Sequence, residues 1–363
     1  MNCKIYQEFV LKIAKSNIIS IFKGFRKNKY FTNPLIRINM NMKIMRKIAG
    51  ILIISAILGS NLNAQTKTDV INAYNEGAKT MQTDPKAAIE AFEKVVVLSD
   101  QVGETAADLK QKAVQVLPGL YVKVASNTIS EKKPAQETII AAKKAAAASE
   151  KYASAANKEN ASKLLVQGYY NMGIEFFTKK DYPNALLAFD SLLVINPNYV
   201  NAIYSKALVF RSQNNATAFE ENIDLYLEKV KSGNDSVKVK QANKLALEFF
   251  RGSGSVANQA NKLDDAIVML NKAAKYGNDK DLFYYFADVY NKQKNYDKGI
   301  ESAQKGLALE TGADDAKAKF YFQLAMAQAG KGQTAEACAS FKSAMFGPFA
   351  EPSKVQRTNL KCK

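Results

Sequence analysis

Apolar residues recur three and four positions apart along most of the chain after residue 65, which is the spacing of an amphipathic helix. The stretch from Lys179 to Pro197 is one example, with Pro183 near its start and Pro197 just after its last apolar residues. Proline fits the first turn of a helix and cannot continue one, so these two prolines mark helix boundaries. No stretch longer than a few residues alternates apolar and polar side chains. The pattern therefore predicts an all-α fold.

The helical pattern repeats with a period of about 34 residues, which is typical of arrays of paired helices. One unit, residues 166–199, has small, aromatic and proline residues at regular positions, namely Tyr169, Gly173, Phe176, Tyr182, Ala185, Phe189 and Pro197. A later copy carries the same small-then-apolar pair at Ala266 and Leu270. The copy at 200–233 is degenerate, because Phe219 replaces the small residue and Lys206 replaces an apolar one.

These positions resemble those of the tetratricopeptide repeat, specifically over residues 166–346 and in outline over 66–346. The resemblance implies a right-handed α-solenoid of stacked antiparallel helix pairs, in which each pair covers the apolar face of its neighbour. The first part, 65–160, matches more loosely and predicts longer helices over Glu104–Ser130 and Pro134–Ala155. A break at Pro118-Gly119 is the alternative for the first of these helices.

Two stretches depart from the regular pattern. The alanine-rich run 141–161 lacks Gly and Pro, so it predicts a mostly solvated helix, with a linker as the alternative. Gly and Ser residues between Arg251 and Asn258 predict an insertion in the copy that contains Ala266 and Leu270.

Residues 42–64 have the layout of a leader. Lys43, Arg46 and Lys47 precede the apolar run Ile48–Leu58, and Ala64 is a small residue at the expected cleavage point. This predicts a signal peptide over 42–64, with an uncleaved anchor as the alternative.

The chain is then expected to divide into an upstream extension, the leader and three further parts. The extension, residues 1–41, is expected to arise from an early start codon, or else to be a genuine basic amphipathic segment. After the leader come looser helix pairs over 65–160, the regular solenoid over 161–346, and a tail over 347–363 that either caps the stack or lies loose.

The net charge of +17 is unevenly distributed. Residues 1–64 hold eleven basic side chains and one acidic one, which leaves 40 basic and 33 acidic side chains, or +7, on the rest of the chain. No concentrated basic stripe follows the leader, so nucleic-acid binding is not expected. The chain has no His, and only Cys338 and Cys362 follow the leader. Without the commonest general base and metal ligand, we expect no catalytic, cofactor or metal site.

The resemblance also implies a binding groove lined by the first helix of each pair. In four units the first core residue is Tyr169, Ile203, Phe283 or Tyr321, and we call the position directly after it the ladder slot. The ladder slot holds Tyr170, Tyr204, Tyr284 and Phe322, and Asn243 in the copy with the insertion. Two further groove positions hold Ile174, Leu208, Asp288 and Met326, and then Phe177, Arg211 and Asn291. These side chains would contact an extended or helical peptide, or alternatively fill space between neighbouring first helices.

Two other features bear on chemistry. The pairs Asp264-Asp265 and Asp314-Asp315 are expected at helix starts, where acids interact favourably with the helix dipole, rather than in acid–base chemistry. Cys338 and Cys362 are predicted to form a disulfide if the chain is exported to an oxidising compartment.

The sequence thus predicts an exported, periplasmic, non-enzymatic scaffold that binds protein or peptide partners and meets the membrane only through its signal peptide. The alternatives are a membrane-tethered assembly or secretion-accessory factor, or an enzyme accessory subunit. The oligomeric state is left open.

Overall fold

The structure, a computed structural model, describes residues 66–363, and every regular element among these residues is helical. The all-α prediction is therefore confirmed for this part of the chain. Contacts divide the chain into residues 1–69 and 70–363, and the described helices belong almost wholly to the second unit. The predictions of an upstream extension and of a signal peptide lie outside the described residues.

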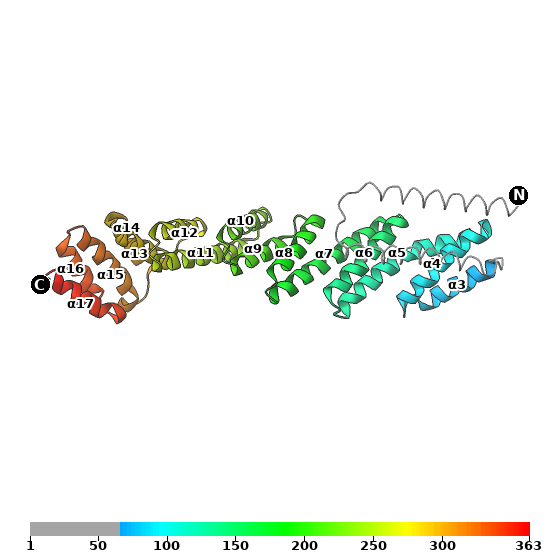
Figure 1. Cartoon of the computed structure of the whole chain (residues 1–363), viewed down its shortest axis with the longest axis horizontal. Helices are drawn as coiled ribbons and strands as arrows, with labels where there is room; N and C mark the ends of the chain where they lie inside the picture. The colour runs from blue at the N-terminus through cyan, green and yellow to red at the C-terminus, as the bar shows by residue number, and fades with distance from the viewer. Residues whose placement is uncertain (1–65) are drawn as a thin grey trace, which may run out of the picture. The chain divides into compact units, whose positions relative to one another are not determined.

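With the labels of Figure 1, the α-helices are α3 (Lys67–Thr80), α4 (Pro85–Val102), α5 (Ala107–Ser130), α6 (Ala135–Lys151), α7 (Ala155–Thr178), α8 (Tyr182–Ile195), α9 (Val200–Ser212), α10 (Ala216–Ser232), α11 (Ser236–Gln259), α12 (Leu263–Tyr276), α13 (Lys280–Lys292), α14 (Tyr296–Leu309), α15 (Asp314–Gly330), α16 (Thr334–Ser343) and α17 (Ala350–Asn359). Two short 3₁₀ helices, η1 (Glu104–Ala106) and η2 (Gly347–Phe349), precede α5 and α17.

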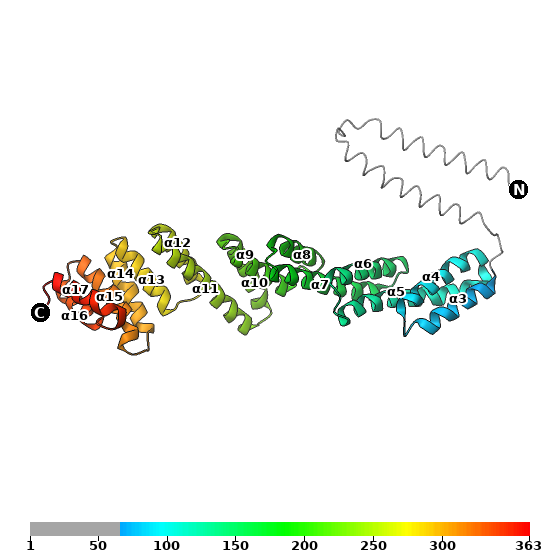
Figure 2. The same cartoon turned by 60° about the horizontal axis from the view of Figure 1, so that its bottom comes forward.

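Consecutive helices form antiparallel pairs joined by short turns (Figures 1 and 2). The first helix of each pair is odd-numbered and the second even-numbered, from α3–α4 to α15–α16. Neighbouring odd-numbered helices also contact one another, in α5–α7, α7–α9, α11–α13 and α13–α15. No two even-numbered helices of the described chain make comparable contact. The predicted stack of antiparallel helix pairs is confirmed, and its right-handedness stays a prediction.

The turns that start many of these helices share one conformation. The residue before the helix N-cap has a left-handed backbone in seven of them, at Ala153, Lys180, Asn214, Asn234, Asn261, Lys294 and Gly332. In three cases the N-cap itself, Asp181, Asn215 or Asp235, accepts a hydrogen bond from a backbone N–H of the first turn. Asp and Asn are favoured there because they satisfy a donor that the helix leaves unpaired. The two predicted acidic pairs also lie in first turns, in α12 and α15.

Small residues allow the two helices of a pair to approach closely. A Cβ atom on Gly173 of α7 would lie 2.4 Å from the ring of Phe189 in α8, and a Cβ on Gly254 of α11 would lie 2.7 Å from Leu270 in α12. Both distances are shorter than a real contact, so only glycine fits without rearrangement. The small position predicted at Gly173 is therefore confirmed.

The stretch from Arg251 to Asn258 is not an insertion. It is the interior of α11, where Gly254 packs against Leu270. The low helix propensity of Gly and Ser misled the prediction, since close approach to α12 favours small residues here. The irregular part is elsewhere: α11 has 24 residues against 13 in each of α9 and α13, and the additional turns lie at its N-terminal end, from Ser236.

The predicted long helices of the first part are confirmed as α5 and α6, with adjusted ends. Helix α5 runs unbroken through Pro118, which is buried inside it, so the alternative of a break is wrong. Helix α6 ends at Lys151, before the predicted Ala155, because Tyr152–Ser154 form a turn.

The alanine-rich run is not a mostly solvated helix. It is divided between α6 and the start of α7, and Ala142, Ala145 and Ala148 of α6 are buried. Helix α6 packs against both α5 and α7. Helix propensity predicted the helices correctly, but alanines three residues apart also form a flat face that lets backbones approach.

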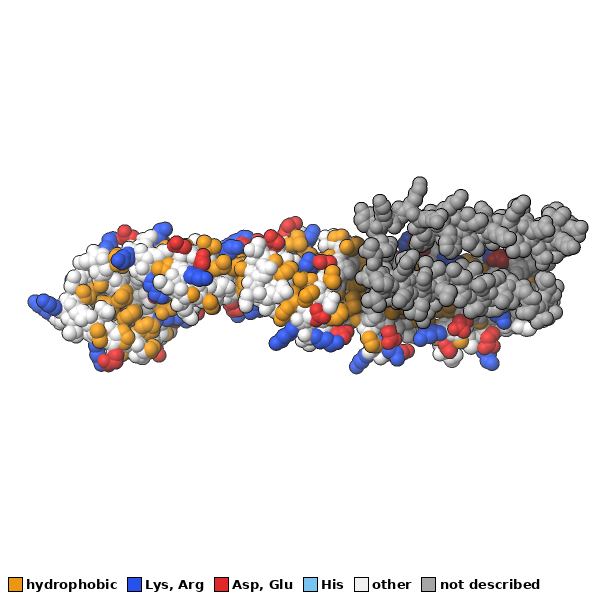
Figure 3. Space-filling model, viewed as in Figure 1, with side chains coloured by type: hydrophobic (Ala, Val, Ile, Leu, Met, Phe, Trp, Pro, Cys, Tyr) orange, Lys and Arg blue, Asp and Glu red, His pale blue; other side chains and the backbone are white. Residues whose placement is uncertain are grey.

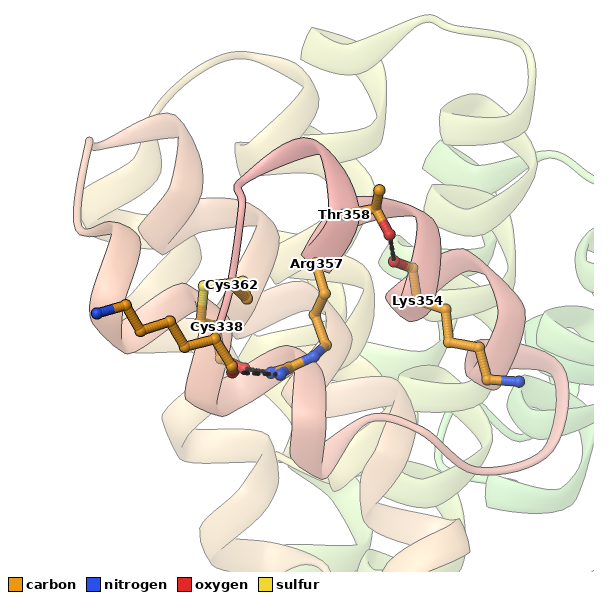
Figure 4. Close-up of a disulfide and its surroundings, with 6 residues drawn as sticks. Cys338, Lys354, Arg357, Thr358 and Cys362 are labelled. Carbon is orange, nitrogen blue, oxygen red and sulfur yellow. Dashed lines mark hydrogen bonds between the residues drawn. A yellow bond between two sulfur atoms is a disulfide. The ribbon is translucent and has the colours of Figure 1, made fainter.

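The tail folds back as a cap. Helix α17 packs against α16, and Cys338 in α16 is bonded to Cys362, with a Cα–Cα distance of 5.6 Å (Figure 4). Arg357 donates hydrogen bonds to the carbonyl oxygens of Cys338 and, at 3.0 Å, of Lys363. The predicted disulfide is confirmed, and the alternative of a loose tail is wrong.

Candidate partner-binding surface

The four aromatic residues of the predicted ladder take equivalent positions on odd-numbered helices. Each is half-buried: Tyr170 on α7, Tyr204 on α9, Tyr284 on α13 and Phe322 on α15. Of the preceding residues predicted to be core, only Ile203 is buried, whereas Tyr169, Phe283 and Tyr321 are half-buried. The prediction that these preceding residues belong to the buried core is therefore wrong at three positions, where large rings are only partly covered.

In α11 the ladder slot holds Arg251, not Asn243. The close-packing Gly254 lies three residues after Arg251, as Gly173 lies three residues after Tyr170. Asn243 lies more than two turns earlier, in the additional N-terminal part of α11. The slot was assigned to Asn243 because the insertion was predicted at Arg251–Asn258 rather than at the N-terminal end of α11.

Most ladder-slot residues also contact the next odd-numbered helix or its N-cap. Ring centroids lie 5.5 Å apart for Tyr170 and Tyr199, 6.2 Å apart for Tyr284 and Phe320, and 5.4 Å apart for Phe322 and Phe349. Arg251 makes the equivalent link through an ion pair with Asp279, the N-cap of α13. The slot thus joins successive pairs, as the space-filling alternative expects, and the binding role of its exposed edges stays a prediction.

Tyr204 is the exception to this forward contact. Its ring lies 4.8 Å from Tyr226 of α10, within the same helix pair. Helices α9 and α11 do not make the substantial contact seen between other odd-numbered neighbours. Instead, Lys272 and Lys275 of α12 form ion pairs with Glu220 of α10, at 2.6 and 3.3 Å. These ion pairs therefore add to the packing of α10 against α11 at this junction.

The predicted groove residues of α7 and α9 are largely apolar. Ile174, Phe177 and Leu208 are half-buried and Arg211 is exposed. Ile174 and Phe177 pack with Tyr170 against the core of the α7–α8 pair. We call the set Tyr170, Ile174, Phe177, Tyr204, Leu208 and Arg211 the α7–α9 face.

The corresponding positions of α11, α13 and α15 are largely polar and bonded to one another. The Asp288 carboxylate accepts hydrogen bonds from Asn258 at 2.6 Å, Lys292 at 2.8 Å and Gln323 at 3.2 Å. Asn291 donates to the side-chain oxygen of Gln323 at 2.9 Å. These are charge-assisted or buried bonds, so they stabilise the contact between odd-numbered helices.

Two more of the predicted residues lie beside this network. Met326 on α15 is half-buried. Burial, and then the charge of Asp288, raise the pKa of Tyr284 above its ordinary value. Asp288 and Asn291, two residues predicted to contact a partner, thus form hydrogen bonds within the chain instead.

The surface offers rings, aliphatic groups and amides rather than reacting groups. Residues 66–363 contain no cluster of His, Cys, Asp or Glu arranged to hold a metal ion. On the face shown in Figure 3, acidic and basic side chains interleave over the coloured part of the chain. No helix among the described residues is both long enough and apolar enough to span a bilayer.

Two open cavities were missed by sequence reasoning. One, of about 690 Å³, lies between α4, α5 and α6, and its lining includes Tyr121 and Tyr152. The other, of about 860 Å³, lies beside the N-terminal part of α11. The sequence does contain a signal for the long N-terminal part of α11 that lines the second cavity, because helical periodicity continues without interruption from Val237 into Phe250.

Several solved structures are similar to the chain. The MamA protein is 20% identical over 55% of this chain and 97% of its own, with a TM-score of 0.32. A tetratricopeptide repeat protein from Parabacteroides merdae is 15% identical over 81% of this chain and 99% of its own, with a TM-score of 0.27. A thermophilic tetratricopeptide repeat protein from Thermus thermophilus is 19% identical over 55% of this chain and 100% of its own, with a TM-score of 0.26. No family model and no curated protein matches the sequence.

The described chain is a helical-repeat protein of paired, stacked α-helices. Its close-packing positions and the contacts between its odd-numbered helices resemble those of a tetratricopeptide repeat.

Proposed function

We propose that the chain is a non-enzymatic scaffold that binds a protein or peptide partner through the α7–α9 face. The observation that carries the proposal is the group of partly exposed Tyr170, Ile174, Phe177 and Leu208 beside the exposed Arg211. Aromatic and Arg side chains are common anchors of protein interfaces, and peptides place apolar side chains between such groups. The contrast with α11–α15 supports this choice, since the polar groups there already bond one another.

The scaffold is further proposed to act after export, as a periplasmic protein cleaved between Ala64 and Gln65. The basic, apolar and small residues of 42–64 support export, and the Cys338–Cys362 bond fits an oxidising compartment. N-terminal sequencing of the exported protein should begin at Gln65. A product that starts upstream of Met42, or that stays in the membrane fraction with residues 42–64 attached, would favour the membrane-tethered alternative.

The binding face is tested with two double variants of residues 65–363. Ile174→Asp with Leu208→Asp changes the α7–α9 face, and Leu187→Asp with Val194→Asp changes two exposed side chains of α8, which are 63% and 84% accessible. We expect partner capture from a periplasmic extract to be lost with the first variant and kept with the second. Circular dichroism melts check that both fold.

Equal loss from both variants, or no loss from either, would contradict the proposal. If capture survives both, a third variant, Asp288→Asn, tests whether the partner instead binds the α11–α15 side.

A further inference from the structure

The second cavity exists because α11 begins earlier than its neighbours. Its additional N-terminal turns form one wall, and the ends of α10 and α12 with the α12–α13 loop form the rest. We call this cavity the α11 trough; its lining is Lys231, Asn234, Asp235, Ser236, Val239, Lys240, Asn243, Lys244, Leu247, Glu248, Tyr276, Gly277, Asn278 and Asp279. Its volume of about 860 Å³ is within the usual range for ligand sites. Of the residues predicted to line the groove, Asn243 alone is in this lining.

The acidic residues of the trough are already paired. Asp235 forms an ion pair with Lys238 at 2.7 Å and caps α11. Asp279 pairs with Arg251 and caps α13 by accepting from the backbone N–H of Leu282. Their negative charge is therefore largely neutralised by cations outside the trough.

The basic residues are mostly unpaired. Lys231 and Lys240 are exposed and make no ion pair among residues 66–363. Lys244 only approaches Glu248, at 3.8 Å. The charge left over within the trough is positive, although the three basic and three acidic side chains of its lining balance in number.

Uncharged groups of the trough can also donate hydrogen bonds. The amide side chains of Asn234, Asn243 and Asn278 form no hydrogen bond within the described chain, and neither do the backbone N–H groups of Gly277 and Asn278. Each amide can donate two hydrogen bonds as well as accept through its oxygen, and the two backbone N–H groups add further donors, so N–H groups as well as lysines are available to a carboxylate.

The apolar part of the trough is short and continuous. Leu247 and Tyr276 are buried and Val239 is half-buried, so they form a floor below the polar rim. A ligand that fits both parts carries several negative acceptors and an occasional apolar group. An extended acidic peptide has this composition, because side chains alternate along an extended backbone.

We propose that the α11 trough is a second docking site, which binds an extended acidic segment of a protein partner through Lys231, Lys240 and the surrounding amides. The inference rests on the proposed scaffold function but uses residues outside the α7–α9 face.

The probe is a short fluorescein-labelled peptide in which Glu alternates with Ser and Leu, measured by fluorescence anisotropy against residues 65–363. We expect binding that weakens about tenfold or more in the double variant Lys231→Glu with Lys240→Glu. The matched control, Lys262→Glu with Lys294→Glu, makes the same charge change at two exposed lysines outside the trough and should bind as the unchanged protein does. Arginine at 231 and 240 should keep binding.

Equal weakening by the control pair would show general charge attraction and overturn the proposal. So would equal binding of a peptide with Gln in place of Glu, or competition by millimolar inorganic phosphate as strong as that by unlabelled peptide. Loss of capture by the α7–α9 variants with peptide binding kept would show that the two sites are separate. If the peptide fails to bind while partner capture persists, the trough proposal fails and the scaffold proposal stands.

Discussion

The regions α5–α7 and α10–α12 are both made of paired helices. Small side chains pack between the helices of the first region, and large aromatic side chains pack between those of the second. Helix α6 has no aromatic residue, and it presents Ala142, Ala145 and Ala148 to its neighbours. Between α10 and α12 the contacts are made by large rings, with centroids 5.6 Å apart for Phe219 and Phe250 and 5.8 Å apart for Phe250 and Tyr276.

The difference shows that the repeat tolerates either chemistry if each face matches its neighbour. Alanine faces bring backbones together and bury little surface per residue, whereas rings fill a wider gap and bury much more. The two regions should therefore respond in opposite ways to a change of side-chain size.

The largest effect is expected from truncation in the aromatic region. Phe250→Ala removes a fully buried ring that contacts three others, so the free energy of unfolding should fall by about 3–5 kcal/mol. Urea unfolding measures the change. Val256→Ala, in the same helix but 67% exposed, is the control and should change it little. A loss below about 1 kcal/mol for Phe250→Ala would mean that the rings are not a stabilising core.

Helix α17, which caps the stack, has fewer buried side chains than either of these regions. In α17 only Ser353 is buried, so the Cys338–Cys362 bond should carry much of its stability. Replacing both cysteines by Ser should cost about 3 kcal/mol, as closure of a loop of this length predicts. Hydrogen exchange should rise in α17 first. The unchanged protein should show no thiol that reacts with a labelling reagent before reduction, and two reactive thiols would contradict the bond.

Enlargement should harm the alanine region. Ala142→Leu places a larger side chain in a fully buried contact of α6, so it should destabilise the chain by about 1–3 kcal/mol. Ala147→Leu, at an exposed position of the same helix, should be nearly neutral. Thermal melts of the two variants decide the matter, and similar melting temperatures would show that α6 does not depend on small residues.

The smallest effect concerns tyrosines in both parts of the chain. Burial raises the pKa of Tyr276 and of Tyr121 above the usual 10.0, followed by hydrogen bonds to Asp224 and Glu93 respectively. The folded state thus holds these protons more tightly than the unfolded one. Stability should be unaffected below about pH 10 and should fall above it. In Tyr276→Phe and Tyr121→Phe that fall should be shallower in melts between pH 9 and 11, and unchanged slopes would contradict the coupling.

Much of the fold was predictable, because small and aromatic residues at fixed positions of the repeat indicate where the two helices of a pair pack against each other. Gly173 and Phe189 define one helix pair from sequence alone, and the structure confirms their contact. The continuation of α11 through residues 251–258 was not predictable in the same way. Gly254 has low helix propensity, and only its tertiary contact with Leu270 shows that it lies inside a helix.

The candidate site was predictable in position but not in use. The ladder slot is recognisable from Tyr170 and Tyr284, yet nothing in the local sequence indicates that a ring will meet Tyr199 or Phe320 of the next pair. Likewise, the sequence alone suggests that the Asp288 side chain is available to a partner, whereas the structure shows it hydrogen-bonded to Asn258 and Gln323. Such contacts depend on the relative placement of pairs, which residue spacing does not encode.

The position of α17 bears on how this chain could lengthen during evolution. Phe349, the N-cap of α17, meets Phe322 as Tyr199, the N-cap of α9, meets Tyr170. Helix α17 thus takes the place of the first helix of a further unit. A duplicated unit inserted between α16 and α17 would separate Cys338 from Cys362, whereas a unit inserted before α15 would leave the bond in place.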